Sequence, residues 1–421
     1  MADADTDPVQ LIATMGAHAR HAAACLARLP ADAKRAGLRA AAAAIRDKAP
    51  DILAANAADM ARARAAGLGR ALLDRLMLDA ARLAAVADAV EAVAALDDPV
   101  GQVIDARTRP NGLALSRVRV PIGVIGIVYE SRPNVTADAA ALCVMSGNAA
   151  ILRGGSEALA SNRALHAAFA DGMERASLPR TAVQLVPTAD RAVVGAMLAA
   201  AGQIDLIVPR GGKGLVARVQ AEARVPVLAH LDGINHVYVD ASADPGMAGA
   251  VVVDAKMRRT GVCGAMETLL IDRAWPHAAE LVVALAATGC TVRGDGAVRA
   301  IAAVDPASAE DWDTEYLDAI CSVALVDGID GALAHIARHG SHHTDAIVAA
   351  DTAVAERFLA EADSAIVLWN ASTQFADGGE FGLGAEIGIA TGRLHARGPV
   401  ALEGLTTYKW VGRGNGQVRG S

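Results

Sequence analysis

Apolar and charged residues alternate with helical periodicity in the first part of the chain. Between Val9 and Leu96, alanine and leucine recur at spacings of three and four residues, with charged residues between them. This spacing is typical of helices that bury one face, so it predicts a layer of helices over this range. Alternating residues then flank a Pro-Asn-Gly turn at positions 110–112. This pattern predicts a β-hairpin at about residues 103–120, a candidate for contact with a partner subunit.

From Gly123 the pattern changes to short apolar strands separated by helical segments. The runs GVIGIVYES, AAILRGG and IDLIVPRGG are each followed closely by a predicted helix, and a second series containing ETLLID, SVALVD and DAIVAAD begins near Gly249. Strand–helix repeats with short connections predict a parallel sheet covered on both faces. Ligands of such sheets bind beyond the carboxyl ends of the strands, so we expect the chemistry in the loops there.

Composition narrows the class of protein. No apolar run approaches the roughly 20 residues needed to span a bilayer, and the start, MADADTDPVQ, lacks the basic and apolar regions of a signal peptide. We therefore expect a soluble cytoplasmic protein. The formal net charge of −8 argues against a nucleic-acid partner, because phosphate contacts need a basic face. The five cysteines include no CxxC pair, so neither a zinc site nor a disulfide framework is predicted.

Two glycine-bearing turns follow predicted strands and open predicted helices, LRGGSEA at residues 152–158 and PRGGKGL at residues 209–215. Glycines let backbone amides approach a phosphate, and the helix N-terminus supplies partial positive charge. Neither turn is a GxGxxG fingerprint, so each is either a phosphate-binding turn or an ordinary tight turn. Arg153 and Arg210 lie in these turns, and an arginine at a strand end can pair with a 2′-phosphate, which favours NADP over NAD.

Asn134 and Cys263 are candidates for catalysis, and each has a structural alternative. Asn134 lies at the start of a predicted helix, where it either caps that helix or donates to a developing oxyanion. Cys263 alone among the cysteines lies in a polar, glycine-flanked loop between helix and strand. Free cysteines are usually buried and inert, so Cys263 is either a core residue or a nucleophile.

Basic residues and histidines surround these candidates in the sequence. Lys256, Arg258 and Arg259 precede Cys263, where they either lower the thiol pKa or interact favourably with a helix C-terminus. The segment HIARHGSHHTDAI contains four histidines but no HExxH motif, so it predicts a polar loop near substrate and no metal site. These histidines are His335, His339, His342 and His343.

These segments together resemble the gamma-glutamyl phosphate reductases, or glutamate-5-semialdehyde dehydrogenases, a branch of the aldehyde dehydrogenase superfamily. The similarity extends nearly end to end, through RVPIGVIGIVYESRPNVTADAAALC, ILRGGSEA, PRGGKGL and EFGLGAEIGIATGRLHARGPVALEGLTTYKW. The stretch VDGIDGALAHIARHGSHHTDAI, from Val326 to Ile347, matches the family's characteristic pattern.

The resemblance implies an aldehyde dehydrogenase-like α/β fold of two Rossmann-like parallel-sheet domains with a small oligomerisation element. We expect an NADPH-binding domain at residues 1–248, interrupted by the hairpin, and a catalytic domain at residues 249–385. Residues 386–421 then return to the cofactor domain or to an oligomer interface. The implied reaction is NADPH-dependent reduction of L-glutamyl 5-phosphate in proline biosynthesis. A homo-oligomer, a dimer or tetramer, is expected, and transient contact with glutamate 5-kinase is left open.

The resemblance also implies roles for single residues. Cys263 falls on the catalytic thiol and Asn134 on the oxyanion-hole asparagine. Cofactor-binding roles fall on Arg153, Gly154, Gly155, Ser156, Arg210, Gly211, Gly212 and Glu315. The chain departs from the family's usual pattern in three places: Gly264 replaces an asparagine, Asn235 replaces a common cysteine, and MRRTGVC replaces a more usual proline-serine approach to the cysteine. His230 stands where hydrolytic aldehyde dehydrogenases carry a water-activating glutamate.

Two other functions fit parts of this pattern. A CoA-acylating aldehyde dehydrogenase would share the thiol and the fold but exchange with CoA in place of phosphate. A nucleotide-binding scaffold that has lost catalysis would keep the fold alone, and the joint presence of Cys263, Asn134 and Glu315 argues against it.

Overall fold

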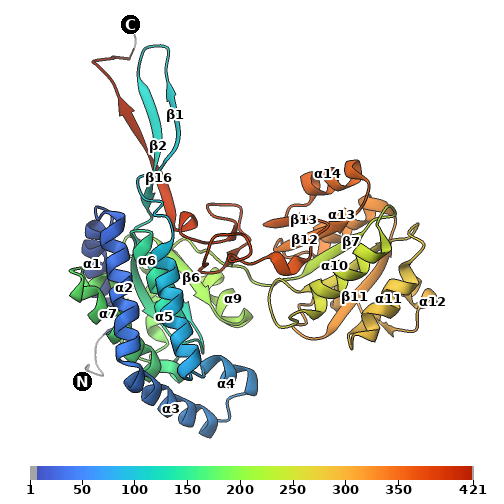
Figure 1. The fold of residues 1–421 in the computed structure, drawn as a ribbon, viewed down its shortest axis with the longest axis horizontal. Helices are drawn as coiled ribbons and strands as arrows, with labels where there is room; N and C mark the ends of the chain where they lie inside the picture. Colours follow the sequence, from blue (N-terminus) through green and yellow to red (C-terminus); the bar gives the residue numbers. More distant parts are fainter. Residues whose placement is uncertain (1–6, 420–421) are drawn as a thin grey trace. The chain divides into compact units, whose positions relative to one another are not determined.

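The computed structural model describes residues 7–419, which fall into two compact units (Figure 1). Unit 1 runs to Ala229 and includes Leu383–Gly388 and the segment from Val400 onward, whereas unit 2 contains His230–Gly382 and Ile389–Pro399. The first six residues, on which the signal-peptide prediction partly rests, lie outside the described residues. Within residues 7–419, no helix combines the length and apolar character needed to cross a membrane.

The predicted helical layer is confirmed in unit 1. Its helices are α1 (Pro8–Leu26), α2 (Ala31–Asp47), α3 (Ala49–Ala65), α4 (Arg70–Leu76) and α5 (Ala80–Ala95). Asp79 caps α5 by accepting from the amide of Arg82. Helix α2 packs closely on α7 (Leu159–Arg175), since a Cβ at Gly172 would lie 2.4 Å from the carbonyl oxygen of Ala40. Glycine is therefore required for this helix contact.

The first series of strands and helices forms a four-stranded parallel sheet in unit 1. The sheet order is β5-β4-β3-β6, with the first predicted strand, β3, next to both β4 and β6. Its elements are β3 (Val124–Tyr129), α6 (Val135–Met145), β4 (Ala149–Arg153), β5 (Val183–Leu185), α8 (Ala192–Ala199), β6 (Leu206–Arg210) and α9 (Lys213–Glu222). The two glycine turns follow β4 and β6, which flank β3, so both turns lie at the carboxyl end of this sheet.

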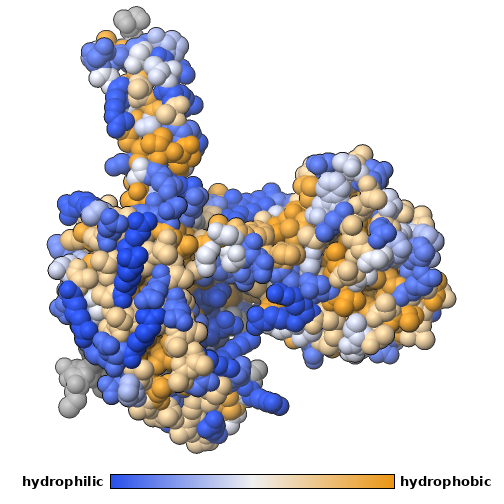
Figure 2. Space-filling view, viewed as in Figure 1, coloured by the Kyte–Doolittle hydropathy of each residue, from blue (hydrophilic) through white to orange (hydrophobic). Residues whose placement is uncertain are grey.

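The predicted hairpin is confirmed and gains a third strand. β1 (Val103–Thr108) and β2 (Ala114–Pro121) pair antiparallel, and β16 (Thr406–Arg413) pairs with the other side of β2. Strand β16 thus brings Thr406–Arg413 back to unit 1. Figure 2 shows hydrophobic residues gathered on this sheet, where four large side chains are exposed. These are Val103, Ile104, Tyr408 and Trp410.

Unit 2 contains the second parallel sheet, of seven strands in the order β10-β9-β11-β8-β7-β12-β13. Buried aliphatic side chains cover both of its faces. Its strands are β7 (Asn235–Val239), β8 (Met266–Asp272), β9 (Thr291–Gly294), β10 (Asp305–Pro306), β11 (Ile320–Val326), β12 (Thr344–Val348) and β13 (Ile366–Trp369). Its helices are α10 (Pro245–Met257), α11 (Ala278–Ala287), α12 (Gly296–Ile301), α13 (Gly328–His339) and α14 (Thr352–Glu361). A short two-stranded sheet joins β14 (Ile389–Ala390) to β15 (Gly398–Pro399).

The domain boundaries predicted at residues 248 and 385 require correction. Strand β7 pairs with β8 on one side and with β12 on the other, so unit 2 begins at His230. Residues 389–399 also belong to unit 2. Strand order along the chain cannot reveal which sheet a connecting strand joins, because that choice depends on hydrogen bonds to other strands, here to β8 and to the distant β12.

Candidate functional site

Cys263 lies in the loop between α10 and β8, half-buried against apolar side chains of Ile366, Ala376 and Ile389. Asn235 fixes the backbone of this loop. Its amide nitrogen Nδ2 donates to the carbonyl oxygens of Cys263 (2.6 Å) and Ala265 (2.8 Å).

The other end of the Asn235 amide is also bonded, since its Oδ1 accepts from the backbone amide of Thr344 at 3.1 Å. Asn235 is fully buried, so these three bonds tie the Cys263 loop to β12. One departure from the family pattern therefore has a clear structural role. At another departure, Gly264, a Cβ would lie 3.1 Å from the carbonyl oxygen of Thr373, so a side chain there would require a shift.

Glu315 and the backbone of Cys263 both approach Gly233. The Gly233 amide donates to Oε1 of Glu315 at 3.0 Å. A Cβ at Gly233 would lie 2.2 Å from the carbonyl oxygen of Cys263 and 2.9 Å from Glu315 Oε1. Only glycine fits this approach without moving the backbone that carries the thiol. The structure therefore brings two of the predicted site residues to one loop of unit 2.

Two histidines lie beside the thiol. One ring nitrogen each of His230 and His343 and the Sγ of Cys263 all lie within 4.8 Å of one another. The two imidazole rings are 5.0 Å apart in an edge-to-face arrangement. Burial, together with a smaller effect of the nearby His230, lowers the pKa of His343 to about 3, so His343 is neutral at physiological pH.

The remaining histidines of the predicted cluster lie elsewhere. His335 and His339 contact each other on α13 with their rings tilted by 43°, and His339 pairs with Asp313. His342 is exposed, and its Nδ1 donates to the carbonyl oxygen of Asp363. Of the four histidines singled out in the sequence, the structure therefore brings His343 to the thiol.

The three basic residues before Cys263 lie in different environments. Arg258 and Arg259 are exposed after the end of α10. Lys256 is fully buried, and its Nζ pairs with Oε2 of the equally buried Glu267 at 2.6 Å. Burial raises the pKa of Glu267 to about 7, against the opposing effect of the Lys256 charge. Lys256 thus stabilises a core carboxylate.

Lys256→Met is expected to destabilise the protein by about 3–5 kcal/mol, because it leaves Glu267 as an unpaired buried acid. Urea unfolding measures this change in the free energy of unfolding. The double variant Lys256→Met/Glu267→Leu should recover most of the loss, and Arg258→Met, at an exposed site, should change stability by less than about 0.5 kcal/mol. A Lys256→Met protein as stable as the parent would refute the buried pair.

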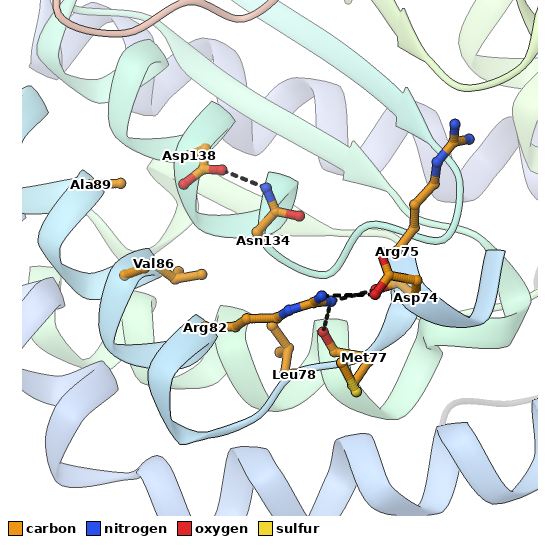
Figure 3. Close-up of a pocket in the computed structure, with 10 residues that line it drawn as sticks. Asp74, Arg75, Met77, Leu78, Arg82, Val86, Ala89, Asn134 and Asp138 are labelled. Atoms are coloured by element: carbon orange, nitrogen blue, oxygen red, sulfur yellow. Dashed lines mark hydrogen bonds and ion pairs between the residues drawn. The ribbon is translucent and has the colours of Figure 1, made fainter. Parts of the chain in front are cut away.

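Asn134 precedes α6, but its side chain makes no capping bond, so the capping alternative is wrong. Its Nδ2 instead donates to Oδ2 of Asp138 at 2.8 Å. Both residues line a pocket of about 340 Å³ in unit 1. Figure 3 shows this bond on the α6 side of the pocket and the Arg82–Asp74 ion pair on the side formed by the α4–α5 segment. The Asn134 amide is therefore held in one orientation at a pocket.

Burial raises the pKa of Asp138 to about 6, although the hydrogen bond from Asn134 and the charge of Arg210 oppose this shift. One carboxylate oxygen, Oδ1, is buried with no hydrogen-bond partner among the described residues. Sequence analysis missed Asp138. Its position four residues after Asn134, on the same face of a helix, was the available signal.

Asp138→Asn is expected to stabilise the protein at neutral pH but not at low pH. Because the folded-state pKa of Asp138 is raised, the acid form stabilises the fold below about pH 4, and this stabilisation is lost as pH rises through about 6. From pH 4 to pH 7.5, the free energy of unfolding of the variant relative to the parent should rise by about 2–3 kcal/mol. Thermal unfolding at both pH values measures this. A pH-independent difference would contradict the raised pKa.

The buried side chain of Arg153 holds the backbone of the first glycine turn. The Arg153 side chain is buried, and its guanidinium donates to the carbonyl oxygens of Gly154 and Ala189, both at 2.9 Å. Burial lowers the pKa of Arg153. Side chains at Gly154 and Gly155 would collide with Asn162 and Glu157, whereas Ser156 is exposed. This geometry favours the tight-turn interpretation of Arg153 over pairing with a 2′-phosphate.

The second glycine turn opens α9 and offers exposed backbone. Gly211 and Gly212 are exposed, and no atom lies within 4 Å of a Cβ position at Gly214. The Gly212 amide donates to Oε2 of Glu130 at 2.9 Å, so a carboxylate already occupies this helix N-terminus. The turn fits a diphosphate if Glu130 releases the amide. Arg210 instead lies close to Gly388, where a Cβ would be 3.0 Å from its Nη1.

The fold and these turns define a class of protein. The model of the "Aldehyde dehydrogenase family" matches residues 3–297 of the chain. A gamma-glutamyl phosphate reductase of Thermotoga maritima, known from its crystal structure, is 41% identical, with a TM-score of 0.94 over 97% of this chain and 100% of that one.

Relatives with similar sequences bear the same name as this crystal structure. The gamma-glutamyl phosphate reductase of Sphingopyxis alaskensis is 71% identical over 97% of this chain and 96% of its own. That of Rhizorhabdus wittichii is 70% identical over 99% of this chain and 97% of its own. The chain belongs to the aldehyde dehydrogenase family and, within it, to the gamma-glutamyl phosphate reductases.

Proposed function

We propose that the chain reduces L-glutamyl 5-phosphate to L-glutamate 5-semialdehyde and releases phosphate, the second step of proline synthesis from glutamate. The relatives that are 70% and 71% identical over nearly the whole chain carry the name of this activity. The observation that carries the proposal is the Cys263 loop, in which a half-buried thiol is held between Asn235, Gly233 and two histidines. A backbone fixed this firmly suits a nucleophile that must meet a carbonyl carbon in one geometry.

The proposed chemistry begins at Cys263. Its thiolate attacks the acyl carbon, a carbon–sulfur bond forms, and the carbon–oxygen bond to phosphate breaks, which leaves a thioester. A nicotinamide cofactor, proposed to be NADPH, supplies hydride when bound. The backbone amide of Cys263 and the side chain of Asn134 are the proposed donors to the oxyanion. Collapse of the reduced adduct releases the aldehyde and returns the thiol.

Residues of this chain suit reduction better than hydrolysis. His230 stands where hydrolytic relatives are expected to carry a glutamate base, and its Nδ1 is engaged with the carbonyl oxygen of Ile389 at 2.8 Å. His343 is buried and neutral. With no carboxylate at the position of that glutamate, activation of water is disfavoured, and the thioester persists until reduction.

Three sets of residues are proposed to hold the cofactor. Gly211 and Gly212 would meet the diphosphate at the start of α9, Ser156 the adenosine ribose, and Glu315 the nicotinamide ribose. We also propose that the protein is cytoplasmic and that it contacts glutamate 5-kinase. A homo-oligomer is proposed to form through the β1–β2–β16 sheet. The exposed Val103, Tyr408 and Trp410 support that interface.

Arg153→Ala is expected to weaken NADPH and NADH equally, because the guanidinium holds the backbone of the turn that both cofactors would meet. Dissociation constants from quenching of protein fluorescence measure this, and the melting temperature should fall. A selective loss of NADPH by about 2–3 kcal/mol would show instead that Arg153 pairs with the 2′-phosphate.

The proposed reaction is tested in reverse, as oxidation of glutamate 5-semialdehyde in the presence of phosphate. We expect turnover that requires phosphate and is faster with NADP than with NAD. Replacement of phosphate by CoA separates the alternative reaction. CoA-dependent turnover without phosphate would identify a CoA-acylating enzyme, and no turnover with either would favour a scaffold.

A further inference from the structure

The two histidines and the thiol come from the amino ends of three neighbouring strands. His230 precedes β7, Cys263 precedes β8, and His343 lies directly before β12. In the sheet these strands are adjacent, in the order β8-β7-β12, and all run parallel. Their preceding loops therefore meet at one edge of the sheet, which explains how three residues distant in sequence converge within unit 2.

Both histidines present a nitrogen suited to a ligand. His343 is fully buried, its Nδ1 bonds with Oγ1 of Thr344, and its Nε2 has no hydrogen-bond partner among residues 7–419. A buried polar atom without a partner is rare in proteins and indicates an unfilled role. The Nδ1 of His230 faces the carbonyl oxygen of Ile389 at 2.8 Å, and a carbonyl only accepts, so Nδ1 carries the proton. His230 Nε2 is then the basic nitrogen, as in metal-binding histidines that are oriented by a carbonyl.

This donor set has a chemical preference. Two imidazoles and one thiolate are ligands of zinc, and three protein ligands leave a fourth position for water. The set contains no oxygen ligand, so it does not suit magnesium or calcium. Zinc–ligand bonds of about 2.0–2.3 Å place tetrahedral ligand atoms roughly 3.5 Å apart. The three atoms here lie within 4.8 Å of one another, so a closure of at most about 1.3 Å completes the site.

We propose that His230, Cys263 and His343 bind one zinc ion and that zinc thereby blocks the enzyme reversibly. On binding, a zinc–sulfur bond forms and the thiol proton leaves to solvent, with no change of oxidation state. The bound thiolate is no longer able to attack a carbonyl carbon. Zinc binding stands on the geometry alone, and the inhibition rests on the proposed role of Cys263 as the nucleophile.

Binding is tested on the full-length, chelator-treated and reduced protein with zinc chloride and a competing zinc-sensitive dye. We expect one zinc ion per chain. Cobalt(II) in place of zinc should give a thiolate-to-metal charge-transfer band and the intense visible bands of a four-coordinate ion. Zinc should also slow alkylation of Cys263 by iodoacetamide, followed by mass spectrometry of the Cys263 peptide.

Variants separate this site from other zinc-binding groups. His230→Ala, at a partly buried position, should weaken zinc at least tenfold, and Cys263→Ser should abolish the charge-transfer band. His342→Asn is the matched control, because His342 is exposed and adjacent to His343 but outside the cluster, and it should bind zinc like the parent. A melting curve with cofactor checks that each variant is folded. Unchanged zinc affinity in His230→Ala, or cobalt binding without a thiolate band, would overturn the proposal.

Activity measurements distinguish the zinc site from the proposed role of Cys263 as the nucleophile. One equivalent of zinc should inhibit phosphate-dependent oxidation of glutamate 5-semialdehyde, and EDTA should restore it. Zinc that binds with a thiolate band but leaves turnover intact would preserve the site and contradict the role of Cys263. Inhibition that survives His230→Ala would place the inhibitory zinc elsewhere and overturn the proposed block.

Discussion

Cys263→Ser is expected to fold and to bind NADPH, yet to lose several orders of magnitude in kcat. A serine alkoxide is far harder to generate at neutral pH than a thiolate, so the attack on the acyl carbon fails. The surrounding loop is held by the carbonyl oxygen of Cys263 and by Gly233, which the substitution does not touch. Steady-state rates, together with cofactor titration and melting temperature, measure the effect.

Other cysteines provide the control. Burial raises the pKa of the Cys290 thiol to about 11, and it raises the pKa of the fully buried Cys143 thiol as well, so neither forms much thiolate at neutral pH. Cys290→Ser should therefore keep kcat within a few-fold of the parent. Loss of activity in Cys290→Ser together with an active Cys263→Ser would show that Cys263 is not the nucleophile.

Asn134→Asp is expected to lose nearly all activity and also stability above about pH 6. A carboxylate cannot donate to an oxyanion and would repel it, so a loss of about 3–4 kcal/mol or more in the transition state is expected, a rate reduction of at least 100-fold. The new carboxyl would also face Asp138, whose Oδ2 accepts from Asn134 at 2.8 Å. Two acids at this distance share one proton, so the pair resists ionisation.

Rates and melting temperatures of three variants resolve the role of Asn134. Asn134→Ala removes both the oxyanion donor and the bond to Asp138, whereas Asp138→Ala removes only the bond. If Asn134 acts on the oxyanion, Asn134→Ala should lower kcat at least 100-fold with little change in KM. Asp138→Ala should then cause a smaller loss, because Asp138 only positions the amide. An active Asn134→Asp enzyme would exclude the oxyanion role.

Local patterns were sufficient for most elements of the fold. The three- and four-residue spacing between Val9 and Leu96 gave helices α1–α5, and the turn at residues 110–112 gave the hairpin. Apolar runs became strands of parallel sheets that are buried on both faces. Such features depend on residues close in sequence, so they can be predicted without a structure.

Features that depend on distant partners were not predictable. The assignment of β7 to unit 2 rests on pairing with β12, and the role of Asn235 rests on bonds to Cys263 and Thr344. From the sequence, Lys256 was a candidate to lower the thiol pKa or to interact with a helix C-terminus, and only the position of Glu267 on β8 shows that the two residues form a core ion pair. Sequence alone does not identify which distant residue a side chain or strand contacts.

Asn134 shows why residue preference alone does not decide a role at the site. Asparagine favours helix N-caps, and Asn134 is at that position, but its side chain turns to Asp138 four residues later. Arg153 similarly lies at a strand end and yet bonds to backbone carbonyls within its own turn. In both cases the hydrogen-bond partner of the side chain, not the residue's preferred position, defines its role in the structure.

The central claim is that Cys263 carries a thioester, and a single-turnover experiment tests it most directly. The enzyme is mixed with glutamate 5-semialdehyde and NADP without phosphate, and NADPH formation and the mass of the Cys263 peptide are followed together. We predict a burst of one NADPH per active site, a glutamyl adduct on Cys263, and its discharge when phosphate is added. A burst with the adduct on another residue, or turnover without any adduct on Cys263, would contradict the account.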